Sequence, residues 1–119
     1  MAGTITAVET RHRTVTEIIF SWLSHTTGAA DATATTYSYS GEIIKVVCIP
    51  GATTPSDLYD VTLSDADSID LLAGQGTDCP SGSSLVITGG ILPVVESTIS
   101  LTIANGGSEK IGTVHVYIR

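Results

Sequence analysis

Apolar and polar residues alternate with a period of two along much of this chain. Such alternation is typical of β-strands, whose successive side chains point to opposite faces of a sheet. The segment from Thr14 to Leu23 is apolar on both sides and has Glu17 as its only strongly polar residue, which predicts an interior strand. Residues 59–63, 99–104 and 114–119 alternate more strictly, as in strands with one buried and one solvated face.

Further strands and the turns between them follow from residue type. Residues 37–40 alternate Tyr and Ser, and the run from Ile43 to Ile49 is rich in β-branched residues before Pro50 and Gly51 end it. No segment shows helical periodicity over the roughly 10 residues that a helix prediction needs. The pattern therefore predicts an all-β fold, a single-domain β-sandwich of jelly-roll or immunoglobulin-like type, with a small barrel as the alternative. Turn-forming residues cluster at 28–36, 50–56, 64–68, 74–84, 89–90 and 105–108.

The two ends of the chain differ. Residues 1–13 are predicted to form an N-terminal arm or a first edge strand ahead of the sandwich domain, residues 14–119, whereas the C-terminal strand has to be held in a sheet. There is neither a run of about 18 apolar residues nor a secretion signal, so we expect no membrane span and a mature chain that begins near Met1. The predicted core is Ile18, Phe20, Val46, Tyr59, Val61, Leu63, Ile99, Leu101, Ile103, Val114, Val116 and Ile118.

The charge of the chain limits its partners. Twelve acidic and five basic residues give a formal net charge of −7, and only 14% of the residues are charged. Nucleic acid and acidic membrane surfaces are therefore not expected as partners, because phosphate binding depends on clustered Lys and Arg. A weakly charged surface fits burial in an assembly, since interface cores are depleted in charge and rich in aromatic residues.

Candidate contact residues follow from this composition. Arg11 and Arg13 flank His12 in the only basic cluster, which is either a solvated strand end or a contact with an acidic surface, including one on a second copy. The aromatic candidates each have a competing interpretation as core residues. The candidate interface residues are Arg11, Arg13, Trp22, Tyr37, Tyr39 and Tyr117.

The two cysteines and the aspartates bear on metal binding. Cys48 lies in an apolar run and is predicted to be a buried thiol, with a disulfide to the more polar Cys79 or an intermolecular role for Cys79 as alternatives. The absence of a CxxC motif argues against zinc. Six aspartates, with no Lys or Arg among them, lie at 57, 60, 65, 67, 70 and 78.

A calcium loop is one interpretation of these acids, because Asp65 and Asp67 have the first spacing of an EF-hand. The match then fails, since Ile69, Asp70 and Gly76 stand where a ligand, a glycine and a glutamate are required. We predict no metal site, and Asp65, Asp67 and Asp70 are the residues that a cation would use. Turn formation, in which Asp side chains accept backbone N–H bonds, is the preferred interpretation.

The segment 65–72 itself has two interpretations. It is either a helical turn capped by Asp65 or, in better agreement with its pattern, a polar turn followed by a second hairpin arm at Ile69 to Leu72.

Catalytic motifs are missing from the sequence. His12, His25 and His115 are scattered, no Gly-x-Ser-x-Gly elbow occurs, and Gly74-Gln-Gly76 lacks the third glycine of a dinucleotide site. A pair of carboxylates for glycoside hydrolysis would need a sheltering cleft that acids on a turn do not provide. We predict that the protein is not an enzyme and takes no cofactor.

Several strand and turn motifs resemble those of one family. They are YSGEIIKVV at 39–47, PGAT at 50–53, YDVTL at 59–63, the acids of the following turn with Leu72, and GTVHVYIR at 112–119. Together they resemble a family of small tailed-bacteriophage and prophage virion proteins over roughly residues 14–119, with a divergent stretch at 77–88. Ser68 stands where that family usually has glycine in the acidic turn.

The resemblance implies a non-enzymatic virion component, with assembly in the host cytoplasm. A capsid cement or decoration protein that stabilises the head shell comes first, a tail, neck or baseplate component second, and a carbohydrate- or ligand-binding module third. The implied partners are the major capsid protein or other virion proteins and further copies of the chain, as a dimer or trimer. In the cement hypothesis, residues 1–13 form a mobile arm that reaches across to a neighbour.

Overall fold

All regular secondary structure in the described residues is β-strand. The computed structural model describes residues 4–25, 30–53, 55 and 59–119. The strands are β1 (Thr4–His12), β2 (Val15–Leu23), β3 (Ala30–Ala34), β4 (Tyr39–Gly41), β5 (Ile43–Pro50), β6 (Asp60–Ser64), β7 (Leu85–Ile87), β8 (Val94–Ser97), β9 (Ser100–Ala104) and β10 (Ile111–Ile118).

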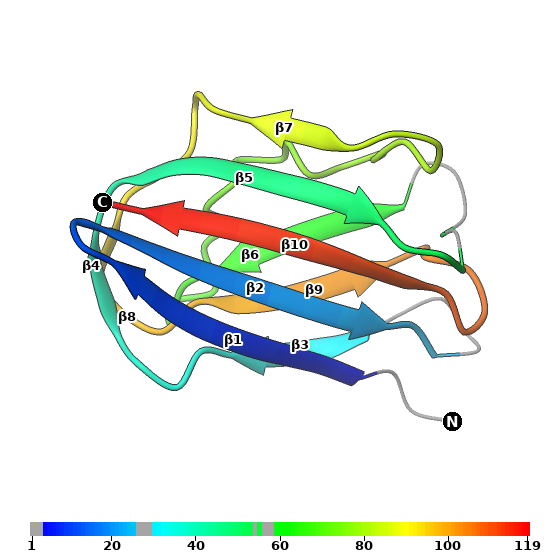
Figure 1. Ribbon diagram of the computed structural model, residues 1–119, viewed down its shortest axis with the longest axis horizontal. Helices are drawn as coiled ribbons and strands as arrows, with labels where there is room; N and C mark the ends of the chain where they lie inside the picture. Colours follow the sequence, from blue (N-terminus) through cyan, green and yellow to red (C-terminus); the bar gives the residue numbers. More distant parts are fainter. Residues whose placement is uncertain (1–3, 26–29, 54, 56–58) are drawn as a thin grey trace.

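The strands form two packed layers (Figure 1). The front layer is a five-stranded sheet in the order β1-β2-β10-β5-β7, and a three-stranded sheet, β3-β9-β6, lies behind it. The short pair β4-β8 closes one end. All the pairings are antiparallel. The predicted all-β sandwich is confirmed.

The chain connects the layers in the manner of a jelly roll. After the β1–β2 hairpin, every connection leads to a different sheet, and the last strand, β10, lies between β2 and β5. Strands that cross between two antiparallel sheets are typical of β-sandwiches, both jelly rolls and immunoglobulin-like folds. This crossing places the C-terminal strand, β10, in the centre of the front sheet, with β2 between it and the N-terminal strand, β1.

The core lies between the two layers. Every residue that the sequence analysis assigned to the core is buried, with exposed fractions from 0% to 4%. Leu71 and Leu72, which follow the acidic turn, and Ile87 and Val94 are further core members that the alternation pattern did not identify. Burial of such aliphatic side chains, at about 1.5–3 kcal/mol each, is the main force that holds the layers together.

The N-terminal segment is a strand rather than a free arm. β1 pairs with β2 at every position from Thr4 opposite Leu23 to His12 opposite Val15, and Ile5 is buried. The mobile-arm interpretation is therefore wrong for residues 4–12, because β1 is part of the front sheet; residues 1–3 lie outside the described part of the chain. At the other end Ile118 is buried and β10 is paired on both sides, as expected.

The acidic turn after β6 leads the chain back to β6 for a single β-bridge. Asp70 pairs with Ser64, and the Leu71 amide donates to the Leu63 carbonyl at 2.6 Å, which agrees with the hairpin interpretation. The expected second strand does not continue, because the Asp70 carboxylate accepts the amide hydrogens of Leu72 and Gly74 and bends the chain into successive turns. Ser68 adopts a left-handed φ of 62°, the conformation that glycine takes most readily.

Both cysteines are buried free thiols. This confirms the prediction for Cys48, whereas the expectation that Cys79 is the more polar one is wrong, since its exposed fraction is 0%. Cys79 is covered because its backbone forms an isolated β-bridge with Tyr59, behind the front sheet. Its thiol donates to the Gly76 carbonyl at 3.1 Å. The neighbouring Cys79 thiol and burial both raise the pKa of Cys48 above its ordinary value.

Candidate functional site

A cleft opens at one edge of the sandwich and brings together three of the predicted contact residues. Arg11, Tyr37 and Tyr39 line a cleft of about 490 Å³, together with Glu9, Thr16, Ser38 and Ser40. Glu9 and Arg11 lie on β1, opposite Ile18 and Thr16 of β2. The arginine and both tyrosines were predicted from the sequence, but Glu9, which organises the cleft, was not.

Glu9 holds the loop that forms the far wall of this cleft. Its Oε2 accepts the Thr36 amide hydrogen at 3.0 Å, and its Oε1 accepts the Tyr37 amide hydrogen at 3.3 Å and the Tyr39 hydroxyl hydrogen. Burial and this bond to the carboxylate raise the pKa of Tyr39. The bonds tie residues 36–39 to β1, so that the Tyr37 side chain projects into solvent with an exposed fraction of 65%.

A second candidate surface covers the front of the molecule. We call it the outer face: the side chains of the five-stranded sheet that point away from the back sheet, as the burial pattern and strand register assign them. They are Thr4, Thr6, Val8, Thr10, His12, Val15, Glu17, Ile19, Ser21, Leu23, Ile111, Thr113, His115, Tyr117, Lys45, Val47, Ile49 and Val86.

The middle of the outer face is a row of four aliphatic residues and one histidine that crosses all five strands, here called the apolar row. Strand register places Val8, Ile19, His115, Val47 and Val86 side by side in that order. The two end residues are well exposed, Val8 at 57% and Val86 at 54%. A sheet face that meets water normally carries polar residues at such positions. The row is therefore an exposed apolar surface that no described part of the chain packs against.

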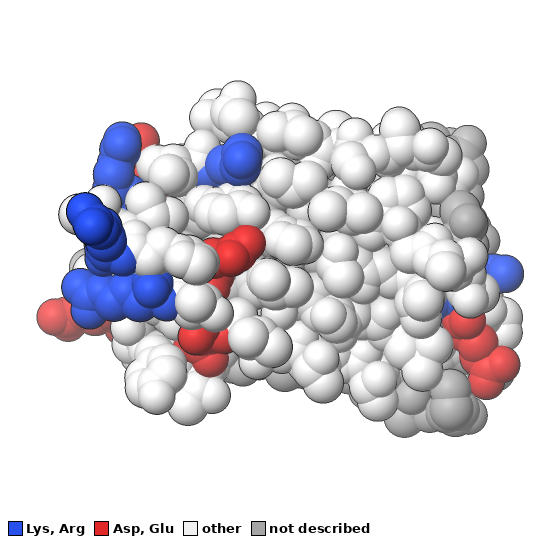
Figure 2. Space-filling view, viewed as in Figure 1, with Lys and Arg blue, Asp and Glu red and all other residues white. Residues whose placement is uncertain are grey.

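Charge is almost absent from the outer face. Figure 2 shows charged side chains near the two ends of the molecule and a broad uncharged area between them. Glu17 and Lys45 are the only Asp, Glu, Lys or Arg residues on the outer face. Both lie in one row at its left end, on either side of Tyr117.

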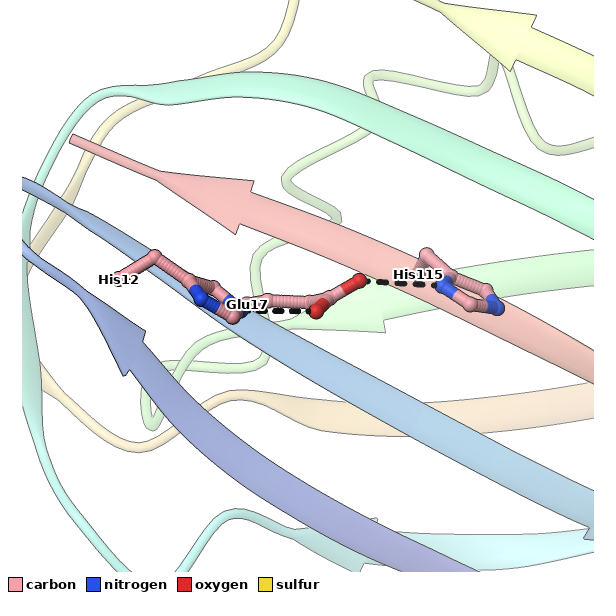
Figure 3. A network of polar contacts seen from close by, with 3 residues as sticks. All are labelled: His12, Glu17 and His115. Atoms are coloured by element: carbon pink, nitrogen blue, oxygen red, sulfur yellow. Dashed lines mark hydrogen bonds and ion pairs between the residues drawn. The ribbon is translucent and has the colours of Figure 1, made fainter.

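The Glu17 and Lys45 side chains both contact neighbouring side chains on the same face. Glu17 accepts from His12 at 3.1 Å through Oε1 and lies 3.4 Å from Nδ1 of His115 through Oε2, as Figure 3 shows. Tyr117 contributes most to lowering the pKa of Glu17, and His12 and His115 lower it further. The Lys45 ammonium lies 4.7 Å from the centre of the Tyr117 ring, within cation–π distance.

An apolar depression of about 410 Å³ indents the opposite end of the outer face. Its floor includes Gly112, behind which lies the Trp22 indole; a Cβ on Gly112 would come within 2.6 Å of Trp22 Cζ2. Trp22 is 2% exposed and packs 5.6 Å from the Tyr59 ring, so its assignment as a contact residue is corrected to a core position. Its Nε1–H has no hydrogen-bond acceptor among the described residues.

The remaining candidates lie apart from both surfaces. Arg13 is exposed in the β1–β2 turn with a φ of 55°. Asp65 Oδ1 accepts the amide hydrogens of Asp67 and Ile69, each at 3.0 Å, as the turn interpretation expects. The described residues contain no group of three or more His, Cys, Asp or Glu side chains arranged to hold a metal, and Asp57 lies outside the described residues.

Comparisons with known proteins leave the chain without an assigned family. No protein-family model and no curated protein matches the sequence. A crystal structure of a cupin domain from Bordetella pertussis is similar, with 12% identity, coverage of 100% of this chain and 97% of that one, and a TM-score of 0.43. No helix among the described residues is long and apolar enough to cross a membrane.

Proposed function

We propose that this chain is a structural component of a bacteriophage virion, a capsid cement or decoration protein that stabilises the head shell through protein–protein contacts. The outer face carries the proposal, because it is a broad sheet surface with aliphatic and hydroxyl side chains and only two charged groups. In this role the protein is not an enzyme, and its partners are the major capsid protein or other virion proteins.

The cost of removing water decides how easily a partner can cover the outer face. Burying a charged side chain against a partner costs several kcal/mol unless that charge is paired, whereas Thr, Val and Ile are covered at little cost. On the outer face Glu17 already contacts His12 and His115, and Lys45 contacts the Tyr117 ring, so a partner has only this one acid and one base to accommodate. Because a capsid shell repeats each such contact many times, small free energies per contact add up to a large total.

The family resemblance supports a virion role over other assemblies. The motifs at 39–47 and 112–119 that carry it overlap β5 and β10, which supply the centre of the outer face. A tail, neck or baseplate component is the alternative within the same proposal, since it would use the same surface.

The experiment is to locate the protein in purified virions and to test the outer face there. Val47→Asp places a charge at the centre of the outer face, and Thr102→Asp places one on β9 in the back sheet as a matched control. We expect both variants to fold, and Val47→Asp alone to be missing from particles by mass spectrometry. Density on tails rather than heads would select the alternative role, and normal incorporation of Val47→Asp would contradict the use of this face.

The cleft favours a second candidate function, the binding of a carbohydrate. Tyr37 offers an exposed ring on which a sugar could stack, and Arg11, Ser38 and Ser40 supply polar groups around it. Titration with a panel of mono- and oligosaccharides, followed by amide NMR shifts, tests it. Shifts at residues 37–40 that Tyr37→Ala removes and Tyr117→Ala keeps would support this function; no shifts with any sugar would exclude it for that panel.

A further inference from the structure

We propose that the outer face packs against the outer face of a second copy of this chain, across a two-fold axis that runs parallel to β10. The inference rests on the proposed function in one respect, since it takes the outer face to be an assembly surface; a dimer that covers this face meets the other virion proteins through the rest of its surface. It adds the identity of the partner and the geometry of the contact.

The outer face has the extent that a homodimer requires. The five strands have 9, 9, 8, 8 and 3 residues. At about 3.3 Å per residue and about 4.8 Å between strands they cover roughly 590 Å² of flat sheet, to which the relief of the side chains adds accessible area. A stable interface buries about 800 Å² on each partner. Nearly the whole outer face must therefore be covered, and an identical face is a surface of matching size, although the depression at Gly112 indents one end of each copy.

Electrostatics restrict where two copies can meet. Each chain carries a formal net charge of −7, so two copies repel each other over most of their surface. The outer face carries one acidic and one basic residue, Glu17 and Lys45, and hence no formal net charge apart from its histidines. Like-charged copies can approach there without juxtaposing acids.

The positions of these two residues select the symmetry axis. β10 is the middle strand of the five, with β2 and β5 on either side and β1 and β7 at the edges. Glu17 on β2 and Lys45 on β5 both lie opposite Tyr117 of β10. A two-fold rotation about an axis along β10 exchanges the places of β2 and β5, so Glu17 of each copy faces Lys45 of the other.

The same rotation matches the apolar row with itself. Ile19 of one copy then meets Val47 of the other, and Val8 meets Val86, because each pair lies at equal distance from β10. Such an exchange of partners is the property of an isologous interface. Two sheets that pack in this way lie about 10 Å apart with their strands within about 30° of parallel.

An axis at right angles to the strands gives a worse interface. Centred on the apolar row, it would place Glu17 against Ser21 and Lys45 against Ile49 of the second copy. Both charges would then be buried without an opposite charge across the interface, which costs several kcal/mol. The Glu17–Lys45 match is thus obtained only with the axis parallel to β10.

The test uses charge reversal in the full chain and measures association by analytical ultracentrifugation. Glu17→Lys and Lys45→Glu each create two like-charge contacts across the axis, and we expect either one to weaken dimerisation at least about a hundredfold. Glu42→Lys makes the same charge change at an exposed site off the outer face and should dimerise at least as well as the natural chain. Circular dichroism checks that each variant is folded.

Mixing the two variants is the decisive step. In a mixed dimer the new lysine at position 17 faces the new glutamate at position 45, and the original pair is kept at the other contact. We expect each variant alone to be monomeric and the mixture to form a 1:1 dimer, as should the double variant. A natural chain that stays monomeric at millimolar concentration, single variants that dimerise normally, or a mixture that does not associate would each overturn the proposal. Incorporation of outer-face variants into virions is a separate measurement, so failure of the dimer and failure of the virion role are distinguishable.

Discussion

The inner and outer faces of the five-stranded sheet are made by the same strands, yet only one of them is covered. On the inner face Phe20, Val46 and Val114 are fully buried beneath the back sheet. On the outer face Ile19 and Val47 occupy the neighbouring positions with partial exposure. The stability of the isolated chain explains the aliphatic residues of the inner face but not those of the outer face, which the proposed assembly contacts would cover.

The largest expected effect contrasts adjacent residues of β2. Phe20→Ala should lower the free energy of unfolding by about 3–5 kcal/mol, because it removes a fully buried ring and leaves a cavity. Ile19→Ala, on the outer face, should cost about 1 kcal/mol or less in the monomer. Urea unfolding at low protein concentration measures both, and equal losses would mean that the outer face is as well packed as the core.

A smaller effect is expected at Gly112, where the floor of the apolar depression lies directly against the Trp22 ring. Gly112→Ala should destabilise the protein by about 1–3 kcal/mol, because the new Cβ would lie within 2.6 Å of the Trp22 ring. Gly82→Ala is the matched control, since a Cβ there meets no atom within 4 Å. Thermal unfolding of the two variants gives the comparison; an unchanged midpoint for Gly112→Ala would show that the indole moves aside freely.

A still smaller effect is expected at the edge where the inner face opens into the cleft. Glu9→Ala removes the acceptor for the amides of Thr36 and Tyr37 and should cost about 1 kcal/mol. Hydrogen exchange at these two amides should become faster, while Tyr39→Phe, which removes only the hydroxyl contact, should leave them protected. Unchanged exchange in Glu9→Ala would show that the loop does not depend on the carboxylate.

The smallest effect is a pH dependence on the outer face. The Tyr117, His12 and His115 contacts hold the pKa of Glu17 below 4.5, so ionisation of this residue adds stability at neutral pH that is lost as the pH falls through the lowered pKa. Glu17→Gln should therefore lie closer in stability to the natural chain at about pH 3 than at about pH 7. Urea unfolding at both values tests this, and a constant difference would contradict it.

Residue pattern predicted β2, β4, β5, β6, β9 and β10, the sandwich and all twelve core positions, because strand geometry translates sequence spacing directly into sheet faces. It also indicated that β2 is apolar on both sides. It missed β7 and β8, and the prediction of a turn at 28–36 is wrong for β3. The sequence pattern gave a wrong prediction where side-chain hydrogen bonds set the course of the backbone. At Asp70 the carboxylate accepts two backbone amide hydrogens and ends the predicted second strand of the hairpin. Trp22 was ambiguous from sequence because an aromatic residue suits an interface and a core equally.

Only the tertiary structure decided which residues share a surface. Glu9 and Tyr37 are 28 positions apart, and Glu17 and His115 are 98 apart, so their contacts depend on the jelly-roll connections that place β1, β2 and β10 together. Strand register across β2, β10 and β5 turned scattered apolar residues into one row and placed Glu17 and Lys45 symmetrically about the central strand. Sequence spacing specifies the face of a strand, but only strand pairing specifies its neighbours.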